Sequence, residues 1–391
     1  GEKNLYGKVV TGTLRSTFVV GESGKVDLAS GSDKLTLADA GATISVANIE
    51  TIVGGESDDI VTVTAAQKGG LFTLGEGTDT VDLFNGQNAV TIKGVESVLG
   101  GTGSDTVTIG ARVTEIEVDL GAGKDKLVLG DYSNTVSVYN AETITGGSKA
   151  DSVMLVGAVT GATYDLAGGS DVLTLDASAG ATITVSNVES IVGGTGDETV
   201  SFSTAANLSL DLDDGNDTVN LSKFANTITL ANVETVVGNT NSDHVTLSAA
   251  VTAASSINLG KGADSLTLGD FDQTVSIANI ETVTGGDSGD VIVVTAAMTG
   301  ATIDMGLGDD TLTINSGISK LTVLNAETIT GSASVEDIVL GSQATGMTID
   351  LAGGKDQLTL MAGVANTVSV ANIETISGRS GDDTVITTAA V

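Results

Sequence analysis

Glycine and aspartate recur together in short turns whose residue types are suited to binding a metal ion. The clearest copy is residues 100–107, GGTGSDTV. Glycine permits the left-handed backbone of a tight turn, the carbonyl groups that it exposes are hard oxygen donors, and an aspartate carboxylate from a neighbouring turn adds the charged ligand that Ca²⁺ prefers. The residue types of this turn are therefore suited to binding Ca²⁺.

Two related boxes carry such turns, and each box occurs eight times. In the first box one Gly and the Asp two residues later persist in every copy: Gly31/Asp33, Gly77/Asp79, Gly123/Asp125, Gly169/Asp171, Gly215/Asp217, Gly262/Asp264, Gly308/Asp310 and Gly354/Asp356. In the second box the acids are Asp59, Asp105, Asp151, Glu198, Asp243, Asp290, Glu336 and Asp383, and the glycine is often replaced. We predict as metal ligands all residues of the first set together with Asp59, Asp105, Asp243, Asp290 and Asp383. Up to about 16 Ca²⁺ ions would then bind.

One copy of the second box carries a lysine, Lys149, where a cation would approach Asp151. We expect that turn to bind weakly or not at all. The competing interpretation of all these turns is purely conformational, because Gly and Asp both tolerate the positive φ angles of turns. Repetition of the acids in register, in a chain of net charge -34, favours the calcium interpretation.

A third box, ANIETIVGG in its first copy (47–55), marks the same repeat. Its glutamate falls at residues 50, 96, 142, 189, 234, 281, 327 and 374, which sets a period of 45 to 47 residues. This glutamate has two interpretations. It is either a solvated residue at a corner, next to a ladder of asparagines such as Asn48, or a further carboxylate for the neighbouring ion.

The turn GGTGSDTV resembles the calcium-binding RTX nonapeptide of hemolysin-type repeat proteins, and the resemblance extends over residues 27–385. It implies a parallel β-roll or β-helix with calcium between stacked turns. The chain departs from that family's pattern because it has one such turn in about every 23 residues instead of two in every 18.

Alternation of apolar and polar residues after each turn, as in TVTI (106–109), predicts short strands with one buried face. Helical periodicity is absent. We therefore predict an all-β, right-handed parallel β-solenoid of eight repeats of about 46 residues, with two coils of about 23 residues in each repeat. A single 46-residue coil per repeat is the alternative. It would stack eight like-charged glutamates at a strand spacing of about 4.8 Å.

Residues 1–24 fall outside the repeat and are predicted to be a degenerate first coil or N-terminal cap, followed by one continuous solenoid domain over 25–391. The sequence stops within a repeat, at TVITTAAV (384–391). An uncapped coil invites strand pairing, so we expect end-to-end self-association into a filament, unless these residues are a fragment of a longer chain.

Composition excludes several classes of function. A net charge of -34 opposes binding to nucleic acids and to anionic lipids, and no apolar run is long enough to cross a membrane. Cysteine is absent, and only ten aromatic residues could stack on sugars. Catalysis needs one site assembled once, whereas here every candidate group repeats, and the single histidine, His244, occupies an outward strand position.

We therefore expect a non-enzymatic, secreted, calcium-binding structural protein that folds on binding Ca²⁺ and assembles into a filament or surface layer. The alternative is the stalk or ligand-binding segment of a repeat adhesin, including an ice-binding one.

Overall fold

The computed structural model describes residues 4–5, 9–11, 17–20, 23–176, 178–250, 255–315 and 317–388. These residues form 43 β-strands, and none of them is helical. The chain divides into two compact units, Gly1–Gly194 and Thr195–Val391, each of which is described by itself. Among the described residues there is no helix with the length and apolar character of a membrane-crossing segment.

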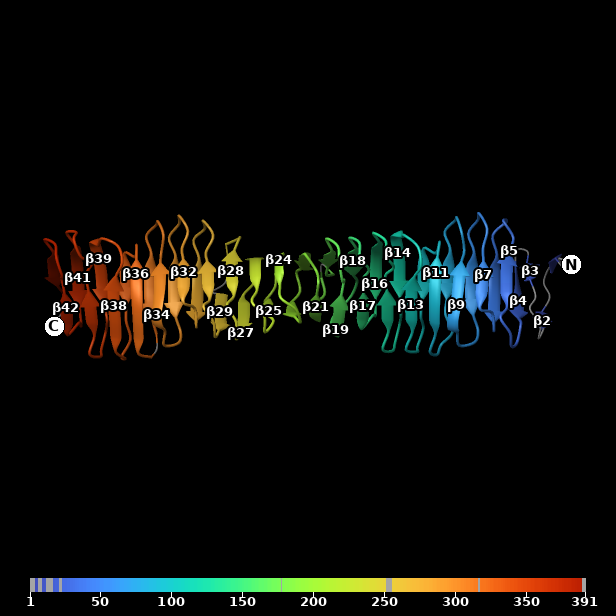
Figure 1. Cartoon of the computed structure of the whole chain (residues 1–391), viewed down its shortest axis with the longest axis horizontal. Coiled ribbons are helices and arrows are strands. Elements are labelled where there is room, and N and C mark those ends of the chain that lie inside the picture. The colour runs from blue at the N-terminus through green and yellow to red at the C-terminus, as the bar shows by residue number, and fades with distance from the viewer. Residues whose placement is uncertain are drawn as a thin grey trace. The chain divides into compact units, whose positions relative to one another are not determined.

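In each unit the odd-numbered strands form one parallel sheet and the even-numbered strands form another (Figure 1). The odd strands of the first unit are β1 (Asn4–Leu5), β3 (Thr17–Val20), β5 (Lys34–Leu37), β7 (Thr51–Val53), β9 (Lys68–Thr73), β11 (Ala89–Lys93), β13 (Thr106–Ile109), β15 (Lys126–Val128), β17 (Thr143–Thr145), β19 (Val159–Asp165) and β21 (Ala181–Ser186). The even strands are β2 (Val9–Thr11), β4 (Ser23–Asp27), β6 (Thr43–Ala47), β8 (Ile60–Val63), β10 (Thr80–Asp82), β12 (Ser97–Leu99), β14 (Thr114–Asp119), β16 (Thr135–Tyr139), β18 (Ser152–Leu155), β20 (Val172–Thr174) and β22 (Ser190–Gly194).

The second unit repeats this arrangement. Its odd strands are β23 (Thr199–Phe202), β25 (Thr218–Asn220), β27 (Thr235–Asn239), β29 (Ser255–Gly260), β31 (Thr274–Ala278), β33 (Val291–Val294), β35 (Thr311–Ile314), β37 (Thr328–Thr330), β39 (Thr345–Asp350), β41 (Thr367–Ala371) and β43 (Thr384–Thr387). Its even strands are β24 (Asn207–Asp213), β26 (Thr227–Ala231), β28 (His244–Leu247), β30 (Ser265–Thr267), β32 (Thr282–Thr284), β34 (Thr299–Asp304), β36 (Ser319–Leu324), β38 (Glu336–Leu340), β40 (Gln357–Thr359) and β42 (Thr375–Ser377).

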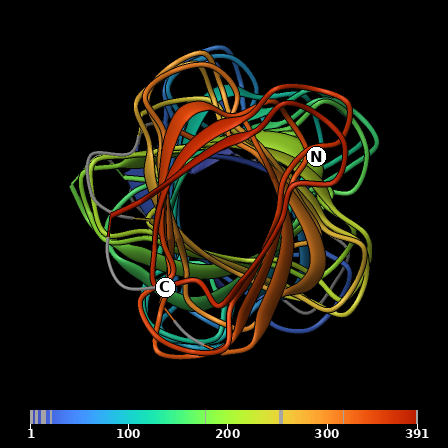
Figure 2. The same ribbon diagram turned by 90° about the vertical axis from the view of Figure 1, so that its left-hand side faces the viewer.

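Alternating hydrophobicity explains why these segments are strands. In β13, Val107 and Ile109 are fully buried while Thr106 and Thr108 face outward, as a period of two requires. The inward residues of both sheets are mostly Val, Leu and Ile, and they form the core of each coil. Seen end-on, the coils of the second unit trace closed turns with their loops on the outside, and the buried side chains fill the interior (Figure 2). The predicted all-β parallel solenoid is therefore confirmed.

The predicted coil length is wrong. Within the repeats, Lys34 pairs with Thr51 and Thr345 pairs with Thr367, so one coil there takes between 17 and 22 residues. Corresponding strands of successive repeats, β5, β10 and β15, are five strands apart, and each coil has two strands. A repeat of about 46 residues is therefore two and a half coils, neither the two coils nor the single coil considered from the sequence.

Corners that lack the Gly/Asp pattern account for this error. The chain turns at Asn48 before β7 and again near Gln67 before β9, and neither corner resembles the turns of the first two boxes. Since the number of coils per repeat is a half-integer, each repeat begins in the opposite sheet from the one before. The first-box turns thus alternate between the two edges of each unit.

The predicted cap, residues 1–24, lies largely outside the described residues. The strands described within it pair in the same parallel manner as those that follow. Asn4 pairs with Val19, and Thr17 pairs with Lys34 of β5.

Candidate functional site

The acids of both Gly/Asp boxes point inward at the corners, directly before a strand. All of them except Asp383 are buried, with exposed fractions of 0–2%. Burial on this scale is unusual for carboxylates, because removing a charge from water is costly unless the charge is paired or hydrogen-bonded. The surroundings of these side chains therefore decide what the corners can do.

The acids stack into what we call carboxylate ladders, as the corner before β13, β15 and β17 illustrates. The backbone amide of Asp105 donates to Oδ1 of Asp125 at 2.6 Å, and the amide of Asp125 donates to Oε2 of Glu142 at 2.7 Å. These three strands are neighbours in the odd-numbered sheet, since Thr106 pairs with Lys126 and Lys126 with Thr143. A ladder thus joins three consecutive coils through their carboxylates.

Seven complete ladders recur with the same two hydrogen bonds. They are Asp59–Asp79–Glu96, Asp105–Asp125–Glu142, Asp151–Asp171–Glu189, Glu198–Asp217–Glu234, Asp243–Asp264–Glu281, Asp290–Asp310–Glu327 and Glu336–Asp356–Glu374. A partial ladder joins Asp33 to Glu50. Each complete ladder takes its first acid from one sequence repeat and its other two acids from the next.

An amide closes one end of most ladders. Asn88 donates both its backbone amide, at 2.8 Å, and its side-chain Nδ2, at 2.9 Å, to Oδ1 of Asp105. Asn134, Asn226 and Asn366 make the same pair of bonds to Asp151, Asp243 and Asp383. Beyond the glutamate, the next corner on the same edge carries an uncharged residue instead, such as the buried Ile116 after Glu96. Like charges are thereby limited to three in succession, which limits their repulsion.

The second carboxylate oxygen of most ladder aspartates has no hydrogen-bond partner. Oδ2 is buried and unpartnered in Asp59, Asp79, Asp105, Asp125, Asp171, Asp217, Asp243, Asp264, Asp310 and Asp356. A buried oxygen in this state carries a desolvation penalty that a proton, a cation or a bound water can offset. Carboxylate oxygens are hard donors that suit Ca²⁺, so the chemistry of these donors fits the predicted metal.

The donors are stacked along the edge rather than gathered at one point. Within the described part of the chain, no group of three or more His, Cys, Asp or Glu side chains converges in the manner of a preformed metal centre. Each carboxylate of a ladder belongs to a different coil, so the predicted ligands are brought together in columns and not in separate turn sites.

Burial changes the acidity of the central aspartate of the ladder. Desolvation, reinforced by the charges of Asp105 and Glu142, raises the pKa of Asp125 to about 6, against the lowering effect of the hydrogen bond from Asp105. The pKa of the central acid rises to about 6, with burial as the main cause, also in Asp79, Asp171, Asp217, Asp264 and Asp310. The central aspartates therefore take up protons as the pH falls through about 6 when no cation is present.

Close packing explains the first-box glycines. A Cβ at Gly123 would overlap the carbonyl oxygen of Gly103 in the preceding coil and would lie 2.9 Å from Oδ1 of Asp125. Gly354 is confined in the same way by Ser334 and by Asp356, whose Oδ1 would be 2.6 Å away. At these two positions glycine is required because the backbone of the preceding coil and the carboxylate of its own aspartate both approach it closely.

The glutamate of the third box is a member of the ladder, which the sequence left undecided. A signal for this role is present in the sequence, because the glutamate follows the first-box aspartate by 17 or 18 residues in every repeat. That interval equals the shorter coil length. The adjacent asparagine has a separate role: Asn140, at a φ of 54°, donates Nδ2 to Oδ1 of Asp119 at 2.7 Å.

The ladder acid beside Lys149, like Asp290, differs from most of the others in having both oxygens hydrogen-bonded. Both oxygens of Asp151 have partners, since Oδ1 accepts from Asn134 and Oδ2 accepts from the amide of Gly147 at 3.4 Å. Lys149 itself is exposed. His244 is exposed on β28, as predicted, with Nδ1 2.7 Å from Ser265 Oγ.

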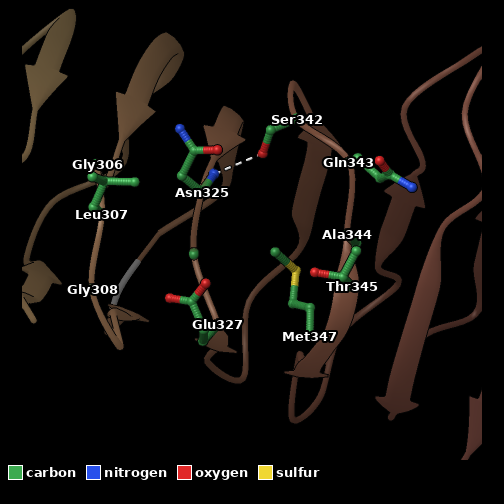
Figure 3. A pocket seen from close by; sticks show the side chains of 11 residues that line it. Gly306, Leu307, Gly308, Asn325, Glu327, Ser342, Gln343, Ala344, Thr345 and Met347 are labelled. Carbon is green, nitrogen blue, oxygen red and sulfur yellow. Dashed lines mark hydrogen bonds between the residues drawn. The ribbon is translucent and has the colours of Figure 1, made fainter.

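A cavity of about 220 Å³ lies in the second unit beside the glutamate of one ladder (Figure 3). Glu327, Thr345 and Met347 line it, and Leu307 forms part of its exposed rim. The amide of Asn325 donates to Ser342 Oγ at 2.7 Å across this region. The cavity is open and shares its only carboxylate, Glu327, with a ladder.

No protein-family model matches this chain, and no curated protein matches its sequence. The resemblance to RTX repeats therefore rests on the motif residues themselves.

Proposed function

We propose that this chain is a segment of a secreted structural protein whose β-solenoid is stabilised by Ca²⁺ in its carboxylate ladders. In this proposal eight repeats wind in a right-handed sense. The observation that carries it is the row of buried, unpartnered carboxylate oxygens, exemplified by Oδ2 of Asp105 and Asp125. Protein interiors rarely retain such groups without a counter-charge.

Folding and cation binding are coupled in this proposal. Without a cation, the two buried carboxylates of each ladder and its more exposed glutamate, in adjacent coils, repel one another and the chain is loosened. A ligand present at ten to one hundred times its Kd stabilises the folded state by about 1.4 to 2.7 kcal/mol per site, so several sites together exceed the usual stability of a domain. The chain would remain loose at the low free Ca²⁺ of a cytoplasm and would become rigid outside the cell.

A structural role suits the repetition of the ladders. Seven equivalent ladders distribute the same chemistry along the chain, whereas an enzyme needs one distinct constellation. We propose that the rigid segment self-associates into a filament or surface layer and has no catalytic activity.

The alternative, a ligand-binding segment of an adhesin, is favoured by one observation. Thr311, Thr328 and Thr348 are paired neighbours on the outward face of β35, β37 and β39, and so form a short column of hydroxyl groups. Val291 of β33 interrupts the column. Filaments or sheets in electron micrographs with calcium would favour the scaffold, and persistent monomers that bind a solid surface would favour the adhesin.

The test of calcium dependence is a titration of the metal-free chain with CaCl₂, followed by far-UV circular dichroism and by the melting temperature. We expect calcium to increase the β signal and to raise the melting temperature, and EDTA to reverse both changes. Magnesium serves as the control, because it requires a smaller and more rigid oxygen shell. A spectrum and melting temperature that calcium does not change, in protein shown to be metal-free, would refute the proposal.

A further inference from the structure

We propose that the first unit carries two oppositely charged faces, through which copies of this chain stack side by side. This inference rests on the proposed self-association and names the surfaces that carry it. The partner is a second copy of the chain. The contact joins the outward face of the odd-numbered sheet of one copy to the outward face of the even-numbered sheet of the next.

The outward face of the odd-numbered sheet is basic, although the whole chain has a net charge of -34. From β5 to β17 the odd-numbered strands contain four lysines and no Asp or Glu, and the acids that adjoin these strands in sequence stand at the corners of the coils. The lysines are Lys34 of β5, Lys68 of β9, Lys93 of β11 and Lys126 of β15. None of them forms an ion pair with another residue that the structure describes. We call this surface the lysine face.

The even-numbered strands of the same coils, β6 to β18, have the reverse composition (Figure 1). They contain no Lys or Arg and four acids, which are Asp82 of β10 and Glu115, Glu117 and Asp119 of β14. All four acids lie at outward positions and are half-buried or exposed. We call this surface the acidic face. The two sheets share one apolar core, so the lysine face and the acidic face point away from each other.

Each face also exposes a leucine among its charges. Leu99 lies between Asp82 and Asp119, since it pairs with both, and it is 43% exposed. On the lysine face, Leu71 of β9 is 37% exposed, three residues after Lys68. Apolar residues surrounded by a polar rim are typical of protein–protein contacts. Contact between the two faces would remove both leucines from water and would place the lysines opposite the acids.

The signs of the charges decide how two copies can meet. Two lysine faces repel each other, and so do two acidic faces, whereas a lysine face attracts an acidic face. The contact therefore joins different surfaces of the two copies and leaves one face of each copy free for a further one. Such a heterologous contact does not close on itself, so it extends sideways into a row. Rows of this kind, combined with end-to-end association, would form a layer.

The dimensions of the faces predict a weak contact between any two copies. The seven odd-numbered strands of the lysine face span about 30 Å at about 4.8 Å per strand, and each strand is about 10–20 Å long. This area is at the low end for a specific protein–protein interface. Surface charges are screened beyond about 10 Å at 0.1 M salt, so the contact should weaken as the ionic strength rises.

The experiment measures self-association of the full chain in calcium by sedimentation velocity, at low and at high salt. One variant reverses the lysine face through Lys34→Glu, Lys68→Glu and Lys126→Glu. The other reverses the acidic face through Asp82→Lys, Glu115→Lys and Glu117→Lys. We expect each variant alone to associate at least about tenfold more weakly than the unchanged chain, because its two faces now carry charges of the same sign. High salt should weaken the association of the unchanged chain.

A mixture of the two variants tests the pairing of the faces directly. The first variant has two acidic faces and the second has two basic faces, so an equimolar mixture should associate again although neither variant does so alone. The matched control combines Lys223→Glu, Lys261→Glu and Lys355→Glu, which change three exposed lysines of the second unit and alter the net charge by the same amount as the first variant. This control should associate as the unchanged chain does.

The melting temperature in calcium, measured for every variant, separates this inference from the proposed function. We expect the reversed variants to melt close to the unchanged chain, since their substitutions lie at outward positions. If the first variant associates as strongly as the unchanged chain, or if the mixture remains monomeric, the two faces are not the contact, while calcium-dependent folding and assembly through other surfaces stand. If the unchanged chain remains monomeric in calcium at every protein concentration, the proposed self-association fails together with this inference.

Discussion

The carboxylate of Asp125 accepts the backbone amide of Asp105 through Oδ1 at 2.6 Å, while its Oδ2 has no hydrogen-bond partner. One oxygen thus supports the fold by satisfying the amide at the corner of the preceding coil. The other oxygen carries unbalanced charge in a buried position. This division between the two oxygens is the basis of the predictions that follow.

Asp125→Ala and Asp151→Ala should rank in opposite orders with and without calcium. In EDTA, Asp151→Ala should cost more, about 2–3 kcal/mol, because it leaves the buried backbone amide of Asn134 without an acceptor and also removes the hydrogen bonds from Asn134 Nδ2 and from the amide of Gly147. Asp125→Ala loses one hydrogen bond but also removes an unpartnered buried charge. With saturating calcium, Asp125→Ala should cost more, since it removes a ligand. The measurement is the melting temperature of both variants in EDTA and in calcium. If the same variant is the less stable one in both buffers, the ladder model is contradicted.

The metal-free chain should lose stability as the pH rises from about 4 to about 6. The central ladder acids have folded pKa values of about 6, above the ordinary value of 3.8, so the folded state holds more protons than the unfolded state in this interval. Stability falls as these protons are lost, and it changes little from this cause above the folded pKa. Melting temperatures in EDTA should therefore be higher near pH 5 than near pH 7.

Calcium should remove most of that pH dependence, because the cation binds the deprotonated carboxylates and offsets the charges that deprotonation creates. A variant with asparagine at Asp79, Asp125 and Asp171 should show a weaker pH dependence in EDTA than the unchanged chain. If the melting temperature changes with pH by the same amount in both proteins, groups other than these three aspartates cause the pH dependence.

Gly354→Ala should destabilise the chain, whereas Gly353→Ala should not. A Cβ at Gly354 would overlap the carbonyl oxygen of Ser334 and crowd Asp356, but a Cβ at Gly353 meets nothing within 4 Å. We expect a loss of about 2–4 kcal/mol for the first change and less than about 0.5 kcal/mol for the second. The two residues are neighbours in one turn, so a difference in melting temperature isolates the close approach of the coils. Similar melting temperatures for the two variants would contradict this explanation.

Asn140→Gly should be tolerated better than Asn140→Ala. Asn140 has a φ of 54°, which glycine adopts freely and alanine does not, and both changes lose the hydrogen bond to Asp119. The expected costs are about 1 kcal/mol for glycine and about 2 kcal/mol for alanine. The second repeat already has glycine at this position, Gly94, with the same φ of 54°. A larger loss for glycine than for alanine in urea unfolding would contradict this explanation.

Local patterns in the sequence were enough to predict the strands and their parallel stacking. Val107 and Ile109 alternate with threonines, and glycine with aspartate marks the corners, so each local preference agrees with a solenoid. The spacing of the Gly/Asp corners led to a wrong prediction of the coil length. Other corners, such as the one at Gln67, carry no Gly/Asp pattern and were therefore not counted. A turn that is stabilised by packing does not require turn-favouring residues such as Gly or Asp.

The sequence by itself determined the repeat, the inward and outward faces of the strands, and which acids stand at corners. Only the tertiary structure decided which acids meet, because that depends on the number of residues in each coil. Seventeen residues separate Asp125 from Glu142 and twenty separate it from Asp105, and both intervals correspond to one coil. Residues distant in the chain become neighbours only when a coil closes. The corner glutamate, although half-exposed or exposed, is for this reason hydrogen-bonded to the amide of an aspartate one coil away.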